Sequence, residues 1–300
     1  MPSMQTTNCV LCGSFEHILL DHVVDHRLHT TNQIFNIVRC SKCGAVYLNP
    51  MPCKDDFPNF YPVAFYASVD NYPRISFFLN QLKFRMVNNL KKKGRIIDVG
   101  CGNGGLLSIF KDNGWMVYGV DTSETACKLA TKSLGGNVYN SSLKDCAFPN
   151  DYFDVVFLNH VIEHMTLPYQ ELDEISRILK NNGLIVLCTP NIGSYQFTVS
   201  GNKWLHLDIP RHVILYSPLT ITRLLRNAGF QVTNTSFPLF DFPLDFYCSL
   251  KRKYSPKHNL SSIAFSPFLL LFSVVAKLLP VWRGSMIVTA IKKAKLHKLN

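Results

Sequence analysis

From Arg95 to about residue 237 the sequence alternates short β-rich runs with stretches of helical character. Six of these runs are predicted strands, at 95–99, 116–120, 137–140, 153–158, 183–188 and 230–236. A further run, 285–291, is predicted to be the last strand. Strands that alternate with helices predict a parallel sheet with helices on both of its faces. The sequence therefore predicts an α/β fold built on a seven-stranded sheet.

The remainder of the chain adds smaller parts to this sheet. With 300 residues, 47% of them hydrophobic, the chain is long enough for one large domain and a small appendage. Paired cysteines mark residues 1–52 as a small module, and 53–93 form a linker with a predicted helix from about Ile75 to Lys92. The main domain is expected to cover 94–300.

Two cysteine pairs in the N-terminal module share one form, Cys9-x-x-Cys12-Gly13 and Cys40-x-x-Cys43-Gly44. Four thiolates on two tight turns satisfy a tetrahedral zinc ion, which predicts a small zinc ribbon. Such a site is closed, so its expected role is to hold together a module too small to fold alone. A redox pair is disfavoured because neither pair lies between a strand and a helix. The other cysteines are expected to be buried small hydrophobes: Cys53, Cys101, Cys127, Cys146, Cys188 and Cys248.

A glycine-rich turn follows the first predicted strand of the main domain. Gly100, Gly102 and Gly105 satisfy G-x-G-x-x-G, which also occurs in dinucleotide-binding dehydrogenases. Asp98, two residues before the first glycine, would repel a diphosphate but attract an ammonium group. Asp121 ends the next strand, where a carboxylate accepts hydrogen bonds from ribose hydroxyls. The turn therefore favours a zwitterionic nucleotide over a dinucleotide.

Several motifs in a fixed order resemble those of the class I S-adenosylmethionine-dependent methyltransferases, which have a Rossmann-like sheet. They are D-x-G-x-G-x-G from Asp98, the acid Asp121, the run 148–156 (FPNDYFDVV), the run 160–164 (HVIEH) and the turn 182–184 (NGL). The resemblance covers most of 95–236. It implies that S-adenosylmethionine is the cofactor and assigns nine residues to its site: Asp98, Gly100, Cys101, Gly102, Asp121, Thr122, Ser142, Leu143 and Asn159. Ser142 stands where the family often has an adenine-binding acid; either Ser142 replaces it or Asp145 reaches in.

Two histidine motifs supply candidate catalytic groups. His160, Glu163 and His164 are spaced to share one face of a helical turn. The string H-x-x-E-H also occurs in inverted zinc proteases, but here it directly follows a core strand at the expected cofactor rim. The second motif, Pro210-Arg211-His212 followed by Tyr216-Ser217-Pro218, resembles an element of methyltransferases that act on small molecules, sugars and ubiquinone precursors.

Methyl transfer from a sulfonium requires alignment of the acceptor and, for a hydroxyl, its deprotonation. We expect His164 or His212 to be the base, because imidazole titrates near neutral pH. A metal held by His160, Glu163, His164 and His212 is the alternative, although related metal-dependent enzymes carry a glutamate at the position of His160. A further interpretation is that one of the histidines has only a structural role, capping the end of a strand.

The predicted acceptor is a small molecule with a hydroxyl group on a sugar, an aromatic ring or a lipid-linked intermediate. The segment 194–208 is a candidate lid whose Tyr195, Phe197 and Trp204 would enclose a ring, while Arg211 binds an acidic group or pairs with Asp208. Two alternatives remain: a nicotinamide-dependent oxidoreductase, and a non-enzymatic zinc-ribbon scaffold with a degenerate cofactor fold.

The net charge of +11 does not by itself predict a nucleic-acid partner, because the basic clusters lack interleaved aromatic residues. These clusters lie at 91–93, 251–253 and 292–298. The apolar segment 263–282 approaches the length of a bilayer span but contains Pro267, Lys277 and Pro280, so we expect a buried or interfacial helix. Peripheral docking on an anionic membrane stays open. With no secretory signal pattern at the N-terminus and many cysteines, the expected location is the cytoplasm.

Overall fold

The computed structural model describes residues 3–62, 73–239, 244–254 and 260–293. The basic residues at 295 and 298 lie outside the described residues. Ten Lys or Arg residues and no Asp or Glu follow Asp245 in the sequence, so this end of the chain carries most of the net charge.

A seven-stranded sheet forms the centre of the molecule, in the order β12-β13-β10-β9-β6-β7-β8. Its strands are β6 (Arg95–Val99), β7 (Met116–Asp121), β8 (Val138–Asn140), β9 (Phe153–Asn159), β10 (Leu179–Pro190), β12 (Phe230–Ser236) and β13 (Ser285–Lys292). Each predicted strand is present, and the α/β Rossmann-like fold is confirmed.

The last strand differs from the prediction of a parallel sheet. β13 lies between β10 and β12 and is antiparallel to both of them. The segment between β12 and β13 contains two helices, α8 (Asp245–Tyr254) and α9 (Leu260–Ala276), which pack against each other beyond the end of the sheet where β12 finishes. Because neither α8 nor α9 crosses back over the sheet, the chain enters β13 from that same end and runs in the opposite direction.

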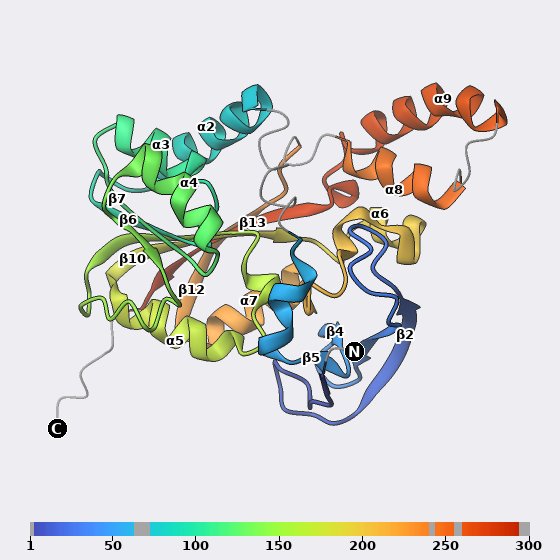
Figure 1. Cartoon of the computed structure of the whole chain (residues 1–300), viewed down its shortest axis with the longest axis horizontal. Coiled ribbons are helices and arrows are strands. Elements are labelled where there is room, and N and C mark those ends of the chain that lie inside the picture. Colours follow the sequence, from blue (N-terminus) through green and yellow to red (C-terminus); the bar gives the residue numbers. More distant parts are fainter. Residues whose placement is uncertain (1–2, 63–72, 240–243, 255–259, 294–300) are drawn as a thin grey trace.

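Helices cover both faces of the sheet (Figure 1). One face carries α2 (Pro73–Leu90), α3 (Gly105–Asp112) and α4 (Glu124–Leu134), and the other carries α5 (Pro168–Ile178) and α7 (Pro218–Asn227). Local capping fixes where several of them begin. Ser217 caps α7 in a capping box with Thr220, and Pro218 occupies the first helical position, where its missing N–H costs nothing.

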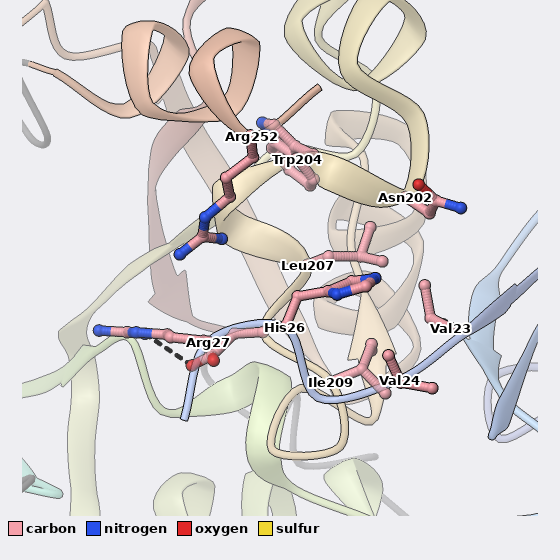
Figure 2. Close-up of a pocket in the computed structure, with 10 residues that line it drawn as sticks. Val23, Val24, His26, Arg27, Asn202, Trp204, Leu207, Ile209 and Arg252 are labelled. Carbon is pink, nitrogen blue, oxygen red and sulfur yellow. Dashed lines mark hydrogen bonds and ion pairs between the residues drawn. The ribbon is translucent and has the colours of Figure 1, made fainter. Parts of the chain in front are cut away.

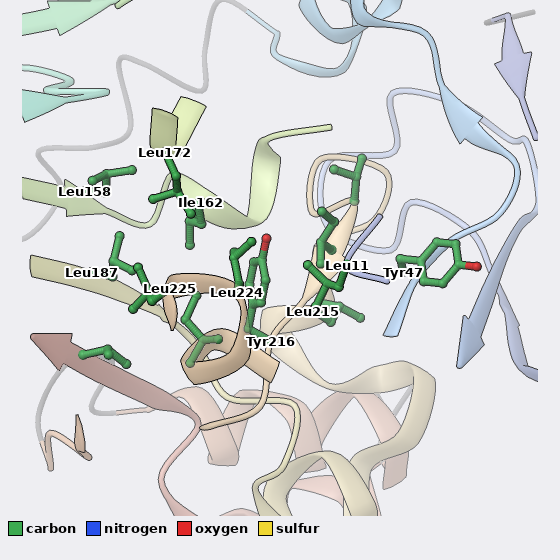
Figure 3. Close-up of a cluster of buried hydrophobic side chains, with 14 of the residues drawn as sticks. Leu11, Tyr47, Leu158, Ile162, Leu172, Leu187, Leu215, Tyr216, Leu224 and Leu225 are labelled. Atoms are coloured by element: carbon green, nitrogen blue, oxygen red, sulfur yellow. The ribbon is translucent and has the colours of Figure 1, made fainter. Parts of the chain in front are cut away.

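The N-terminal module is a small antiparallel sheet that is continued by a strand of the main domain. β2 (His17–Val23), β3 (Phe35–Cys40) and β4 (Val46–Leu48) pair in order, and β11 (Ile214–Leu215) pairs with β4. β1 (Met4–Gln5) pairs with β5 (Met51–Pro52), and the short helix η1 (Lys54–Phe60) follows. Figure 3 shows Leu11 and Tyr47 of the module beside Leu215 and the apolar side chains of the main domain, all in one buried cluster. The two parts therefore share a hydrophobic core.

The remaining short elements lie between β9 and α7. They are η3 (Ile162–His164), α6 (Tyr195–Ser200), η4 (Gly201–Lys203) and η5 (Leu205–Leu207), while η6 (Pro280–Trp282) precedes β13. Within the described part of the chain, none of the helices combines the length and hydropathy that crossing a bilayer demands.

Candidate active site

The cofactor turn lies between β6 and α3 and requires glycine at its key positions. Gly100 and Gly102 have φ angles of 73° and 55°, a region that disfavours side chains. A Cβ on Gly100 would lie 2.5 Å from Val161 Cγ2, whereas a Cβ on Gly102 would meet nothing within 4 Å. The backbone of Gly102 is thus exposed to open space, as close approach of a ligand requires.

Asp98 lies beneath this turn in a position that suits a cationic ligand. Its side chain is buried, and Oδ1 has no hydrogen-bond partner among the described residues. Burial raises the pKa of Asp98 well above its usual value, and nearby Lys83 opposes this effect. An ammonium group in the turn would satisfy the orphaned oxygen and restore the charged carboxylate. This arrangement fits the methionine part of S-adenosylmethionine.

Asp121 ends β7 beside the same turn. Its two carboxylate oxygens accept hydrogen bonds from the backbone N–H of Gly102 (2.9 Å) and of Ser123 (2.9 Å). Burial raises the pKa of Asp121, while the N–H groups of Ser123, Gly102 and Thr122 lower it. Asp121 therefore connects the two loops that form the predicted nucleotide site.

The other predicted cofactor residues end or follow neighbouring parallel strands of the sheet. Ser142 Oγ donates to Asp145 Oδ2 (2.6 Å), so both candidates for the missing adenine-binding acid lie together. Leu143 and Cys101 are buried. Asn159 ends β9 and accepts a hydrogen bond from Lys83 Nζ (2.8 Å).

Lys83 is a site residue that sequence reasoning missed. It comes from α2, in the segment assigned to a linker, and its side chain is buried between Asn159 and Asp98. Phe84 of the same helix packs edge to face on Phe110 of α3, with ring centroids 5.1 Å apart. The sequence shows Lys83 next to the apolar residues of α2, which was the available signal. The neighbouring residues do not indicate which strand that side of the helix packs against.

Glu163, His164 and His212 form a compact cluster next to the turn. One potential ligand atom from each lies within 4.8 Å of the others. Nδ1 of His164 hydrogen-bonds to the carbonyl oxygen of Arg211 (2.9 Å), and Nδ1 of His212 to that of His206 (2.8 Å). A neutral ring that donates from Nδ1 keeps a lone pair on Nε2, and His212 Nε2 lies 3.9 Å from Glu163 Oε1.

His160 has a different place from the one that its spacing predicted. It precedes the η3 turn with a φ angle of 57°, and its Nδ1 contacts Glu163 Oε1 at 3.3 Å. Glu163 Oε2 accepts from Thr189 Oγ1 (3.0 Å). His160 thus orients Glu163 and lies outside the group of residues able to hold a metal, which corrects the predicted four-residue set.

The charges of this cluster follow from burial and from its neighbours. Burial opposes ionisation of Glu163, but the hydrogen bond from His160 and the nearby histidines lower its pKa to about 2. Burial and the neighbouring His164 lower the pKa of His212 to about 4. His212 is consequently neutral at pH 7 and a weak base, contrary to the expectation that it titrates near neutral pH.

Arg211 does not face an acceptor. Its fully buried guanidinium donates to Asp25 Oδ1 (2.8 Å) and Oδ2 (3.0 Å) and to Asp208 Oδ1 (2.7 Å). Asp25 belongs to the loop after β2, so this ion pair joins the N-terminal module to the main domain. The predicted pairing with Asp208 is confirmed, and the predicted binding of an acidic acceptor group is wrong.

Two of the three aromatic residues of the predicted lid lie together: Phe197 packs against Trp204, with ring centroids 5.7 Å apart. Trp204 is buried, with its indole N–H directed to Gln196 Oε1 (3.3 Å), whereas Tyr195 is half exposed and packs against Trp282. Figure 2 shows a pocket that Trp204 lines together with Arg27 and Arg252. Asp208 also lines it and lies 3.9 Å from His212 Nε2, so the pocket borders the histidine cluster.

The four predicted zinc ligands lie together at the tip of the module. Cys9 Sγ is 3.4 Å from Cys43 Sγ, and Cys12 Sγ is 3.5 Å from Cys40 Sγ. Sulfurs around a tetrahedral zinc at about 2.3 Å are about 3.8 Å apart, so the cluster has nearly the required size. Gly13 and Gly44 adopt φ angles of 71° and 76°, and the N–H of each closes its turn onto Cys9 or Cys40. The two knuckles are therefore alike in structure as in sequence.

Comparison with known proteins identifies the class of this fold and site. A family model described as a methyltransferase domain matches residues 74–235, over half of the 300 residues. The chain therefore belongs to the methyltransferase-domain family, and the predicted resemblance to S-adenosylmethionine-dependent methyltransferases is confirmed. The match begins at α2, so it includes the helix that carries Lys83.

Individual curated relatives are similar to about half of this chain. The ubiquinone biosynthesis O-methyltransferase of Rhodopseudomonas palustris is 32% identical over 149 residues, 46% of this chain and 59% of that protein. The enzyme of the same name from Thiobacillus denitrificans is 29% identical over 168 residues, 51% of this chain and 72% of that protein. A probable S-adenosylmethionine-dependent methyltransferase of Mycolicibacterium smegmatis is 28% identical over 141 residues, 47% and 53% of the two chains. The chain thus spans between 53% and 72% of the length of these relatives.

Two solved structures share the fold. A methyltransferase from Archaeoglobus fulgidus superposes with a TM-score of 0.53 at 21% identity, covering 77% of this chain and all of that one. A phosphoethanolamine N-methyltransferase from Haemonchus contortus superposes with a TM-score of 0.55 at 18% identity, covering 89% of this chain and 65% of that one. At these identities the likeness concerns the fold alone.

Proposed function

We propose that this protein transfers the methyl group of S-adenosylmethionine to a hydroxyl group of a small-molecule acceptor. The observation that carries the proposal is the Glu163, His164 and His212 cluster, which lies beside the glycine turn and its orphaned Asp98 oxygen. The O-methyltransferase names of the relatives support oxygen as the nucleophile. A sugar, an aromatic ring or a lipid-linked intermediate remains the proposed carrier of the hydroxyl.

The chain's own residues have two tasks in this reaction. The glycine turn and Asp121 would hold S-adenosylmethionine, which supplies the methyl group, and alignment of the acceptor with it would lower the barrier to transfer. The acceptor proton then needs a base. His164 is the better candidate, because His212 is buried and weakly basic. Tyr61 Oη lies 3.0 Å from His164 Nδ1 and, with the Arg211 carbonyl, orients the ring.

The same cluster fits a divalent cation. Two imidazoles whose Nδ1 atoms are oriented by carbonyl oxygens, together with a carboxylate of depressed pKa, form a usual three-ligand set. A cation held by Glu163, His164 and His212 would lower the pKa of an acceptor hydroxyl near it. His160 and Thr189 would then keep Glu163 in position.

We further propose that Cys9, Cys12, Cys40 and Cys43 hold one structural zinc ion. The spacing of the four sulfurs supports this assignment, as does the burial of Cys9, Cys40 and Cys43. Burial disfavours the thiolate of Cys40, yet the backbone N–H groups of Cys43 and Lys42 lower its pKa to about 7. The knuckle backbone therefore prepares this thiol to bind a metal.

The cofactor assignment predicts a ligand-specific gain in stability. S-Adenosylhomocysteine at 100 times its Kd should stabilise the wild-type chain by about 2.7 kcal/mol, and NAD should not. Asp121→Ala should lose this shift, because it removes the acceptor that joins the two cofactor loops. Thermal unfolding with each ligand is the measurement, with the exposed Asp112→Ala as the control. A shift with NAD alone would establish the oxidoreductase alternative instead.

The catalytic assignment predicts that His164→Ala lowers kcat at least about 100-fold, the usual effect of removing a general base. Labelled S-adenosylmethionine and fractionated small-molecule extract would provide the assay, with exposed His22→Ala as the matched control. If His164 instead binds a cation, its Nε2 cannot also be the base, and the wild type should then contain a second metal equivalent that Glu163→Gln loses while retaining zinc. Label transferred chiefly to RNA or protein would contradict a small-molecule acceptor, and unchanged turnover in both His164→Ala and His212→Ala would remove the proposed bases.

A further inference from the structure

Helix α9 and the turn after it have their polar residues inside and their apolar residues outside. Ser273 and Lys277 are buried: Ser273 Oγ donates to the carbonyl of Leu269 (2.6 Å), and Lys277 Nζ to Asp245 Oδ1 (2.8 Å). In contrast, Phe268 and Leu271 are 65% and 64% exposed. A helix on a water-facing surface has the opposite distribution. The outward face of α9 is therefore suited to an apolar environment.

The exposed apolar face is continuous along the segment 268–281. Its large exposed side chains are Phe268, Leu270, Leu271, Phe272, Val274, Val275, Leu278, Leu279 and Val281. Figure 1 shows the α8–α9 hairpin projecting from the body of the molecule, with the first turns of α2 at the same upper edge. Those turns expose Phe77 and Phe78. A contiguous apolar surface of this kind marks an interaction site.

The base of the hairpin is firmly packed, so the outward face has a fixed orientation. Asp245, at the start of α8, is buried and accepts from Lys277 and from His206 Nε2 (3.0 Å). Phe246 packs against Trp282, with ring centroids 5.4 Å apart. These contacts hold both ends of the hairpin to the main domain. Rotating α9 to bury its apolar face would bring the side that is now buried to the surface and break the ion pair of Lys277 with Asp245.

The exposed charge on the described part of the hairpin is basic. Lys251 and Lys253 are exposed in the last turn of α8, whereas Asp245, the acidic residue of that helix, is buried. We propose that the α8–α9 hairpin docks this protein on the surface of an anionic lipid bilayer, with the apolar face of α9 in the interface. Two-fold pairing with a second copy would instead bring the two basic segments together.

The dimensions agree with a helix that lies in the interface. α9 has 17 residues, fewer than the ~20 of a spanning helix, and its C-terminal end is tied to the protein by Lys277. Apolar burial and attraction of basic residues to anionic lipid add in such a case. If the proposed function holds, docking would also bring the histidine cluster close to the membrane. His206 contacts Asp245 at the base of the hairpin, and its carbonyl oxygen lies within hydrogen-bond distance of His212 Nδ1.

Vesicle flotation of the full chain tests this docking without relying on activity. We expect binding to vesicles that contain phosphatidylglycerol, weaker binding to pure phosphatidylcholine, and weakening by salt on the anionic vesicles only. The triple variant Leu271→Gln, Val275→Gln, Leu278→Gln should lower the partition coefficient at least about tenfold. Lys251→Gln with Lys253→Gln should reduce binding to the anionic vesicles selectively.

The matched control replaces exposed apolar residues of the N-terminal module: Phe15→Gln, Ile18→Gln and Ile34→Gln. It should float as the wild type does. Three results would overturn the proposal: no flotation of the wild type on either vesicle, equal flotation of the triple variant, or a wild-type dimer in solution that the triple variant converts to monomer without any vesicle binding. Methyl transfer by the lipid-free protein should be unchanged in the triple variant, which separates this inference from the proposed function.

Discussion

If the four-cysteine cluster holds the proposed zinc ion, withdrawing that ion is expected to unfold the N-terminal module and abolish methyl transfer. Structural zinc contributes about 10–16 kcal/mol in small zinc-binding peptides, as much as the entire stability of a typical domain, ~5–15 kcal/mol. Loss of β2, β3 and β4 would leave β11 without its partner strand. His212 lies two residues before β11, so the damage should reach the cluster of Glu163, His164 and His212.

The double variant Cys40→Ser, Cys43→Ser measures this effect. Elemental analysis should show no zinc, and amide exchange should show loss of protection in β3 and β4. The amides of β6 and β7 should stay protected from exchange. One face of these strands packs against α2, α3 and α4 in an apolar cluster that the N-terminal module does not share. Cys53→Ser with Cys146→Ser is the control and should retain one zinc per chain. Full zinc content in the Cys40, Cys43 variant would refute the ligand set.

Asp25→Ala is expected to destabilise the chain by about 3 kcal/mol, the lower end of the cost of breaking a buried ion pair, because Arg211 keeps Asp208 as its second partner. Arg211 is fully buried and has both guanidinium ends directed to Asp25 and Asp208. Asp25 also accepts the backbone N–H groups of Leu28 and Thr30, which would lose their partner. Because the Arg211 carbonyl holds His164 Nδ1, turnover should fall as well. Urea unfolding and kcat are the measurements.

The pH dependence of stability provides a second readout of this ion-pair group. Burial opposes ionisation of Asp25 and Asp208, but Arg211 lowers the pKa of Asp25, and His212, Arg27 and Arg211 lower that of Asp208 to about 2. Lowered folded-state pKa values stabilise the fold above the unfolded value of ~4, and this stabilisation is lost as pH falls from there toward about 2.

Asp25→Ala should therefore lose stability less steeply than the wild type over that acid range. Exposed Asp55→Ala should match the wild type in both midpoint and slope, within about 0.5 kcal/mol. A wild-type midpoint for Asp25→Ala would show that the module and the main domain are not coupled through Arg211.

Patterns within a few residues predicted the strands, the glycine turn and the cysteine knuckles. The strand at 95–99 has the predicted bounds, and the turn needs glycine at Gly100 because a Cβ there would strike Val161. The role of Lys83 had no such signal, since its partner Asn159 lies 76 residues away. The antiparallel direction of β13 could not be predicted from its own residues either. It depends on the end of the sheet at which the α8–α9 hairpin lies.

The sequence by itself determined the class of this protein. Its strands, its glycine turn and its two cysteine knuckles follow from periodicity, glycine positions and cysteine spacing, which neighbouring residues set. Only the tertiary structure decided what the charged and apolar side chains do. Arg211 pairs with Asp25 across 186 residues of sequence and is thereby removed from the acceptor, while α9 turns Lys277 inward to Asp245 and leaves Leu271 exposed. Burial and ion pairing depend on which segments, distant in sequence, pack against each other in the fold. A pattern of neighbouring residues does not predict this.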